Sequence, residues 1–126
     1  MPANVIQTSN APAPIGPYSQ AISTGNMLFV SGQIALNPLT QTIDAKTIAE
    51  ETRQVMSNIH GILQQAGMEF NNIVKTTIYL SDMSLFAEVN EIYATYFTAN
   101  FPARETLAVK GLPKNVNVEI SVIAAK

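Results

Sequence analysis

The stretch TIAEETRQVMSNIHGILQQA, residues 47–66, carries the clearest periodicity in the sequence. Its inward-facing set recurs every three or four residues and consists of Ile48, Thr52, Val55, Met56, Ile59, Leu63 and Ala66. The polar side consists of Glu50, Glu51, Arg53, Gln54 and Gln64. This pattern predicts an amphipathic helix, and Thr47 with Glu50 matches a capping box at its beginning. Gly67 stands where a helix commonly ends.

Segments with the composition of strands lie on both sides of this helix. Residues 26–31 and 73–80 are rich in β-branched and aromatic side chains, which favour strands. Residues 86–97 return to helical spacing, and residues 104–109 and 116–124 again indicate strands. The order β, α, β, α, β, β predicts an α+β fold in which both helices cover one face of a mixed sheet.

The opening segment, residues 1–18, is interrupted by proline or glycine at positions 12, 14, 16 and 17. These residues favour an extended or irregular backbone, so we expect most of the segment to run without regular structure. The sequence has 126 residues, which is enough for one hydrophobic core and too few for two. Residues 1–126 are therefore predicted to form a single domain.

Charged residues are sparse. They make up 13% of the chain, whereas 47% of the residues are apolar, and the net charge is -2. A soluble domain with so few charges is expected to bury part of its outer surface, so we predict an oligomer. The same charge balance argues against a nucleic-acid partner, because binding to phosphates depends on clustered cations.

Many catalytic chemistries lack the residues they need here. There is no cysteine, which excludes disulfides, thiolate nucleophiles and thiolate metal ligands. The single histidine, His60, is on the flank of the first predicted helix, where packing or surface exposure explains it better than catalysis. Asp44, Glu50, Glu51 and Asp82 precede or begin predicted helices, where capping explains them without a metal. We expect no metal site.

No apolar run in the sequence reaches the length needed to span a bilayer. The first ten residues have neither the basic start nor the apolar stretch of a signal peptide. The sequence therefore predicts a cytoplasmic protein without a membrane partner.

The two closing strands bring charge into the sheet. Apolar and polar side chains alternate over residues 116–122, which directs Glu119 away from the helices. Arg104 and Thr106 share one face of the preceding strand. If the two strands pair as a hairpin, Arg104 and Glu119 project from the same helix-free face. Such a guanidinium can bind a carboxylate in a bidentate manner, but an ion pair of Arg104 with Glu105 or Glu119 explains it equally well.

Four blocks of the sequence resemble the RidA (YjgF) family of reactive-intermediate deaminases. They are GPYSQA at 16–21, FVSGQI at 29–34, Asn90 with PAR at 102–104, and LP at 112–113 with VEI at 118–120. The blocks occur in the family's order over nearly the whole chain and are most similar to the imine-hydrolysing subgroup. The resemblance implies a chorismate-mutase-like α+β subunit, with the sheets at the centre of a homotrimer and a site in each cleft between subunits.

The resemblance also implies a reaction, the hydrolysis of 2-imino or enamino acids to 2-keto acids and ammonia. Substrates of this kind, including 2-iminobutanoate and 2-iminopropanoate, are released by pyridoxal-phosphate-dependent dehydratases. No cofactor is implied. Arg104 would clamp the substrate carboxylate, and Glu119 would position or deprotonate the attacking water. Tyr18, from the adjoining subunit, would form a hydrogen bond near the imine.

The substrate-binding residues implied by the resemblance are Ser31, Gly32, Asn90 and Thr106. Ser31 and the Gly32 backbone would shape the pocket, while Asn90 and Thr106 would line it. Many relatives have cysteine where this chain has Thr106, so thiol chemistry is not essential here. Two rival functions remain open at this level. One is a regulatory or chaperone-like module that binds a small carboxylate without converting it, and the other is an endoribonuclease or translation inhibitor, which the net charge of -2 disfavours.

Overall fold

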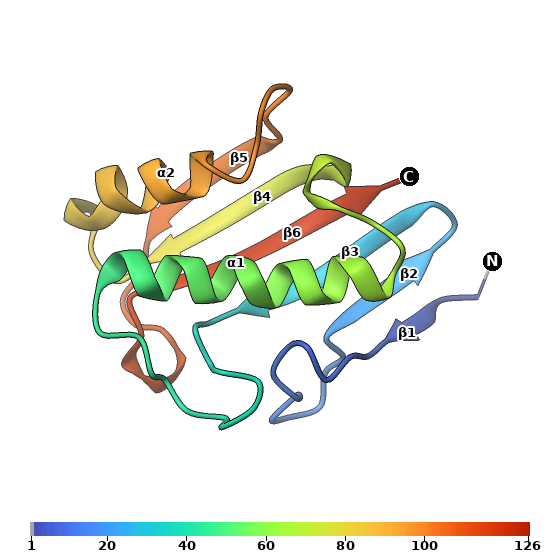
Figure 1. Cartoon of the computed structure of the whole chain (residues 1–126), viewed down its shortest axis with the longest axis horizontal. Helices are drawn as coiled ribbons and strands as arrows, with labels where there is room; N and C mark the ends of the chain where they lie inside the picture. Colours follow the sequence, from blue (N-terminus) through green and yellow to red (C-terminus); the bar gives the residue numbers. More distant parts are fainter. Residues whose placement is uncertain (1) are drawn as a thin grey trace.

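A computed structural model describes residues 2–126, and Met1 lies outside the described residues. The chain forms a six-stranded mixed sheet with two helices packed on one face (Figure 1). The strands are β1 (Asn4–Ile6), β2 (Ala21–Thr24), β3 (Met27–Gln33), β4 (Ile73–Leu80), β5 (Ala103–Ala108) and β6 (Val118–Ala125). The helices are α1 (Ile48–Gln65) and α2 (Phe86–Ala94), with short 3-10 turns at Phe70–Asn72, Met83–Leu85 and Pro113–Asn115. The predicted α+β class is confirmed.

The first predicted helix begins after Thr47 and ends before Gly67, as the capping residues in the sequence predict. Thr47 caps α1, because its hydroxyl oxygen accepts a hydrogen bond from the Glu50 amide at 3.1 Å. The Glu50 carboxylate accepts from the Lys46 amide at 2.7 Å, one residue before the position that a standard capping box uses. Gly67 follows the helix with a φ of 73°, a left-handed conformation that favours glycine.

One residue on the predicted polar side of α1 is buried. Glu51 is 6% exposed, and its carboxylate accepts hydrogen bonds from the backbone amides of Asn117 at 2.7 Å and Val118 at 2.8 Å. The expectation that Glu51 is a solvated residue of the helix start is therefore wrong. The carboxylate is satisfied by amides at the beginning of β6, where the strand has no partner for them, and it ties α1 to that strand.

The structure has two strands that the sequence did not indicate, β1 within the opening segment and β2 just after it. β1 and β2 are short, and a tight turn at Gly25 and Asn26 joins β2 to β3 as a hairpin. Residues 7–18 contain no helix or strand, in agreement with their prolines and glycine. Strands of three or four residues carry too little periodicity to be recognised in the sequence.

The two closing strands do not form the hairpin that the sequence left open. The strand order is β1-β2-β3-β6-β4-β5, so β4 lies between β5 and β6. β5 is parallel to β4 because α2 connects the two as a crossover, whereas β6 is antiparallel to both β4 and β3. This insertion of β6 into the middle of the sheet decides where Arg104 and Glu119 point.

The alternation of side chains places Arg104 and Glu119 on opposite faces. Arg104 pairs with Thr76, which is fully buried beneath the helices, so Arg104 projects toward the helix side. Glu119 pairs with Tyr79 and alternates with Val118 and Ile120, both fully buried under α1. The expectation that the guanidinium and the carboxylate share a helix-free face is therefore wrong for a single chain.

Candidate active site

The first group of predicted site residues surrounds a hollow beside β3 and β6. The hollow measures about 390 Å³, and Tyr18, Ser31, Gly32 and Glu119 line it together with apolar side chains such as Ile34. These four polar positions come from the segment before β2, from β3 and from β6. The structure thus brings together four of the seven residues that the family resemblance selects.

A β-bulge sets the position of Glu119. Between the pairs Val30–Val122 and Gln33–Ile120, two residues of β3 oppose one residue of β6. Gly32 is one of the two, and the Glu119 side chain lies directly over it: a Cβ built at this glycine would overlap Glu119 Oε2 and lie 2.9 Å from its Cδ. Glycine is therefore required at position 32 for the carboxylate to reach its place in the hollow.

The environment of Glu119 favours a base. Burial raises the pKa of its carboxyl group, because the hollow removes water from the charged form. Among the described residues, no cation or hydrogen-bond donor compensates for this loss. A carboxylate that is partly desolvated and unpaired accepts a proton more readily than one in water.

The wall of this hollow is fixed by backbone hydrogen bonds. The Ser31 hydroxyl donates to the Ser19 carbonyl at 2.6 Å, and the Ser31 amide donates to the Gln20 carbonyl at 2.9 Å. Gln20 is 2% exposed, and its amide group donates to the carbonyl oxygens of Ala11 and Pro12 at 3.2 and 2.8 Å. The residues that follow Tyr18 are therefore bonded both to residues 11–12 and to β3.

Arg104 and Asn90 form the second group, on the other side of the sheet. The guanidinium donates from Nη1 to Asn90 Oδ1 at 2.6 Å and lies 5.2 Å from the centre of the Tyr93 ring and 5.6 Å from that of Phe86. A hollow of about 400 Å³ adjoins these side chains, and Phe101 and Pro102 line its edge. This group can bind an anion, because its cation is held but not neutralised.

Neither ion pair considered for Arg104 from the sequence is formed. Glu105 instead pairs with Lys75 at 3.2 Å and accepts from the Thr77 hydroxyl at 3.2 Å, on the face opposite to Arg104. Glu119 lies on that opposite face as well.

Thr106 follows Arg104 on the same face of β5. Its hydroxyl oxygen is buried and has no hydrogen-bond partner within residues 2–126. An unpaired buried hydroxyl costs about 1–3 kcal/mol relative to a paired one, so a ligand or a second chain that bonds to it is favoured.

One chain does not join the two groups. The Cα atoms of Arg104 and Glu119 are two strands and three register positions apart, a separation of roughly 14 Å. Their side chains also point to opposite faces of the sheet. One small ligand therefore cannot touch both residues of a single chain.

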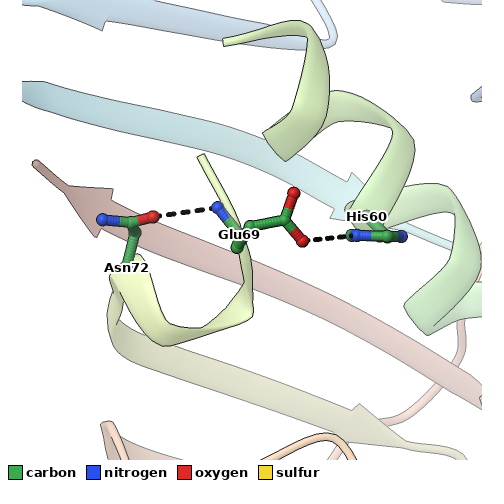
Figure 2. Close-up of polar contacts among 3 residues, drawn as sticks. All are labelled: His60, Glu69 and Asn72. Carbon is green, nitrogen blue, oxygen red and sulfur yellow. Dashed lines mark hydrogen bonds and ion pairs between the residues drawn. The ribbon is translucent and has the colours of Figure 1, made fainter. Parts of the chain in front are cut away.

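His60 belongs to neither group, as the sequence analysis expected. Figure 2 shows its ring beside Glu69, with Nε2 and Oε1 2.9 Å apart, while the Glu69 amide donates to Asn72 Oδ1 at 2.9 Å. The His60 ring also stacks on Phe70 at 4.9 Å. These contacts secure the connection between α1 and β4. Within the described part of the chain, no three His, Asp or Glu side chains gather closely enough to hold a metal ion.

Four residues that shape these groups were missed as site residues by sequence reasoning: Gln20, Glu51, Phe86 and Tyr93. Phe86 and Tyr93 did carry a signal, because with Asn90 they have the spacing i, i+4, i+7 of one helix face. Their role depends on β5 lying next to β4, which the sequence did not indicate. Gln20 and Glu51 carried no signal of burial.

Residues 8–126 match the family described as endoribonuclease L-PSP, which is also called the YjgF/RidA family. A RutC family protein of Pyrococcus horikoshii is 52% identical over 97% of each chain. The 2-iminobutanoate/2-iminopropanoate deaminase of mouse is 46% identical, over 97% of this chain and 90% of the mouse protein. The crystal structure of the YjgF gene product of E. coli has 44% identity and a TM-score of 0.93, and 98% of each chain is covered.

The chain therefore belongs to the YjgF/RidA family, and the family resemblance inferred from the four sequence blocks is confirmed. A Rid family protein of Yersinia pestis superposes with a TM-score of 0.96 at 48% identity, over 99% of this chain and all of that one. The fold is thus that of the family. No helix among residues 2–126 combines the length and the apolar character needed to cross a membrane.

Proposed function

We propose that this protein hydrolyses 2-imino acids, such as 2-iminobutanoate and 2-iminopropanoate, to 2-keto acids and ammonia. The observation that carries the proposal is the pair of complementary groups, a held but unneutralised guanidinium and a desolvated, unpaired carboxylate. The first suits the carboxylate end of an imino acid, and the second suits the water that attacks its C2 carbon. Two mammalian relatives that are 45% and 46% identical to this chain are named 2-iminobutanoate/2-iminopropanoate deaminase.

In the proposed reaction, Arg104 binds the substrate carboxylate and orients the C=N bond. The Glu119 carboxylate takes a proton from water as the oxygen bonds to C2, and the C=N electron pair moves to nitrogen. Glu119 returns this proton to the nitrogen, which gives a carbinolamine with an amino and a hydroxyl group on C2. Glu119 then carries the hydroxyl proton to the nitrogen, the C–N bond breaks, and ammonia leaves as the C2 oxygen becomes the keto group. One water is consumed and no cofactor is needed. Positioning and a fixed base supply the rate increase.

The proposal places the site between subunits of a homotrimer. Tyr18, Ser31, Gly32 and Glu119 of one subunit would face Arg104, Asn90 and Thr106 of the next, repeated around a ring. Such a head-to-tail contact closes when the rotation permits it. The helix-free face supports packing between copies, since Phe29 and Leu107 are 44% and 46% exposed there. The orphan hydroxyl of Thr106 gains a partner when substrate or subunit covers it.

A coupled assay tests the activity. The protein is added to threonine dehydratase and threonine, and the formation of 2-oxobutanoate is compared with that from spontaneous hydrolysis. We expect acceleration by the wild type and none by Arg104→Ala, with light scattering giving the mass of a trimer for both. A wild type that binds 2-oxobutanoate but does not accelerate its formation would support the regulatory module instead.

The family description requires a parallel test for ribonuclease activity. Wild type purified at high salt is incubated with single-stranded RNA, and we expect no cleavage because the chain has only two arginines and a net charge of -2. Cleavage that disappears in Arg104→Ala would replace the deaminase proposal.

A further inference from the structure

Arg104 stands on a strand that does little to hold it. β5 is an edge strand that pairs with β4 alone, and its residues are exposed apart from Thr106. Among the described residues, Arg104 forms no ion pair. An arginine in that setting ordinarily samples many rotamers, which weakens any ligand contact that requires one of them.

Helix α2 supplies the missing constraint. Phe86, Asn90 and Tyr93 follow one another at i, i+4 and i+7, so a single face of the helix presents all three to the guanidinium. Asn90 accepts from Nη1 at 2.6 Å, and the two aromatic rings lie 5.6 and 5.2 Å from Cζ. Both rings are within the distance at which a guanidinium is attracted to an aromatic face.

Tyr93 is itself fixed at its far end. Its hydroxyl donates to Thr76 Oγ1 at 2.9 Å, and the side chain is 3% exposed. Thr76 is also the residue of β4 that pairs with Arg104 in the sheet. The same point of the sheet therefore determines both the backbone of Arg104 and the ring on which its guanidinium rests. This double attachment makes the ring a rigid platform.

We propose that Phe86 and Tyr93 are positioning residues that hold the Arg104 guanidinium in the orientation required to bind a carboxylate. Aromatic contacts use the faces of the guanidinium plane, whereas hydrogen bonds to a carboxylate form in that plane. Arg104 has five N–H donors and uses one of them on Asn90. The platform thus restricts the side chain without occupying the donors that a substrate needs. The functional part of this inference rests on the proposed deaminase activity.

A spectroscopic experiment tests the platform without any activity. The chain has only two arginines, so a proton–nitrogen correlation spectrum of the arginine Nε–H groups contains two signals, and Arg53→Lys assigns them. In the free wild type we expect the Arg104 signal to be displaced by ring currents and Arg53 to resonate near an exposed arginine. Phe86→Leu and Tyr93→Leu each remove one ring, and the Arg104 signal should move toward the position of Arg53.

Tyr93→Phe is the milder second variant, since it keeps the ring and loses only the bond to Thr76. The matched control is Tyr96→Leu, because Tyr96 packs on Phe70 at 5.1 Å and does not contact Arg104. Control and test variants are compared for the midpoint of thermal unfolding. Tyr96→Leu should lower that midpoint and leave the Arg104 signal in place.

Steady-state kinetics then distinguish a loss of Arg104 positioning from a general loss of structure. Loss of a ring should raise the KM for the imine and the Kd for 2-oxobutanoate by about three- to tenfold, with kcat changed less than about twofold. Tyr93→Phe should give a smaller rise, and Tyr96→Leu none. The inference is overturned if the two wild-type arginine signals coincide, or if ligand affinity is unchanged in a variant whose Arg104 signal has moved. Absence of deaminase activity in the wild type refutes the proposed function, while the spectra still decide whether the platform exists.

Discussion

The two halves of the candidate site are built in different ways. Glu119 lies on β6, a central strand that pairs on both sides, and its position follows from the backbone through a bulge and a glycine. Arg104 lies on the edge strand β5, and its position follows from side chains of α2. The sheet therefore sets the position of Glu119, the proposed base, whereas packing between helix and strand sets the position of Arg104, the proposed anion-binding residue.

This difference matches the demands of the two tasks. A general base must hold one proton-accepting oxygen near a single water, and an error of about 1 Å is costly. A carboxylate clamp tolerates substrates of several shapes as long as its cation faces them. The comparison predicts that changes near Glu119 alter the rate of the chemical step, whereas changes near Arg104 alter substrate affinity.

The largest effect is expected from mixing the two halves. Arg104→Ala and Glu119→Gln should each lower kcat/KM by at least about 100-fold, because each removes one half of every site. When the two variants are co-assembled in equal amounts, about one quarter of the contacts between subunits join two intact halves. Activity should therefore return to about one quarter of the wild-type value.

The controls for this mixture are the two variants kept separate and combined only in the assay. Differently tagged chains, purified through both tags, show that mixed oligomers have formed. A trimer purified in this way always contains both variants, so one of its three contacts joins two intact halves and its activity should be about one third of the wild-type value. A mixed oligomer no more active than its parents would place both halves of the site in the same chain and contradict the proposed site between subunits.

Gly32→Ala should produce the next largest effect. A methyl group at position 32 overlaps the end of the Glu119 side chain, which must rotate away from the hollow. We expect kcat to fall by about 100-fold with little change in the Kd for 2-oxobutanoate, because the Arg104 half is untouched. Gly111→Ala is the matched control, since a Cβ there meets no atom within 4 Å. Equal losses in the two variants would count against the bulge as the device that places Glu119.

The pH dependence should follow the raised pKa of Glu119. The carboxylate must be ionised to accept a proton, so kcat/KM should fall as the pH is lowered through this pKa, at a higher pH than for an exposed glutamate. The imine is supplied by an amino-acid oxidase in excess, so that its formation does not limit the rate. Glu119→Gln should lack this acidic limb, and a limb that persists in the variant would assign it to another group.

The same pKa has a consequence for stability. A carboxyl group with a raised pKa in the folded state retains its proton where the unfolded chain has already lost it. Folding stability from this group therefore falls as the pH rises from the usual glutamate pKa to the raised one. The gain in unfolding free energy from Glu119→Gln should be larger at pH 8 than at pH 4, as measured by urea denaturation.

The smallest effect on the chemistry is expected from the buried carboxylate of α1. Glu51→Ala leaves the amides of Asn117 and Val118 without an acceptor and should lower the free energy of unfolding by about 2–4 kcal/mol. Glu51→Gln keeps one acceptor oxygen and should cost less. Because β6 begins at these amides, well-folded Glu51→Ala should show a reduced kcat and an unchanged Kd for 2-oxobutanoate. A change in that Kd with no change in kcat would contradict the prediction that changes near Glu119 act on the chemical step.

Local patterns were sufficient for the two helices and for the strands at the centre of the sheet. The periodicity of residues 47–66 and the run at 73–80 gave α1 and β4 with nearly their observed bounds, because each segment contains several full periods. The alternation along residues 116–122 also directed Glu119 away from the helices, as observed. The family blocks identified the candidate residues of both halves, but they did not show that the two halves lie on opposite faces of the sheet.

The amino-acid sequence by itself determined the α+β class and the amphipathic face of α1, and its four family blocks selected Arg104 and Glu119 as the candidate pair. Only the tertiary structure decided that β6 enters the sheet between β3 and β4, and this separates Arg104 from Glu119. The physical reason is that alternation along a strand is local, whereas strand order depends on crossovers and pairings between segments distant in sequence. The same long-range pairing buries Glu51, sets Glu119 over Gly32 and brings α2 to Arg104.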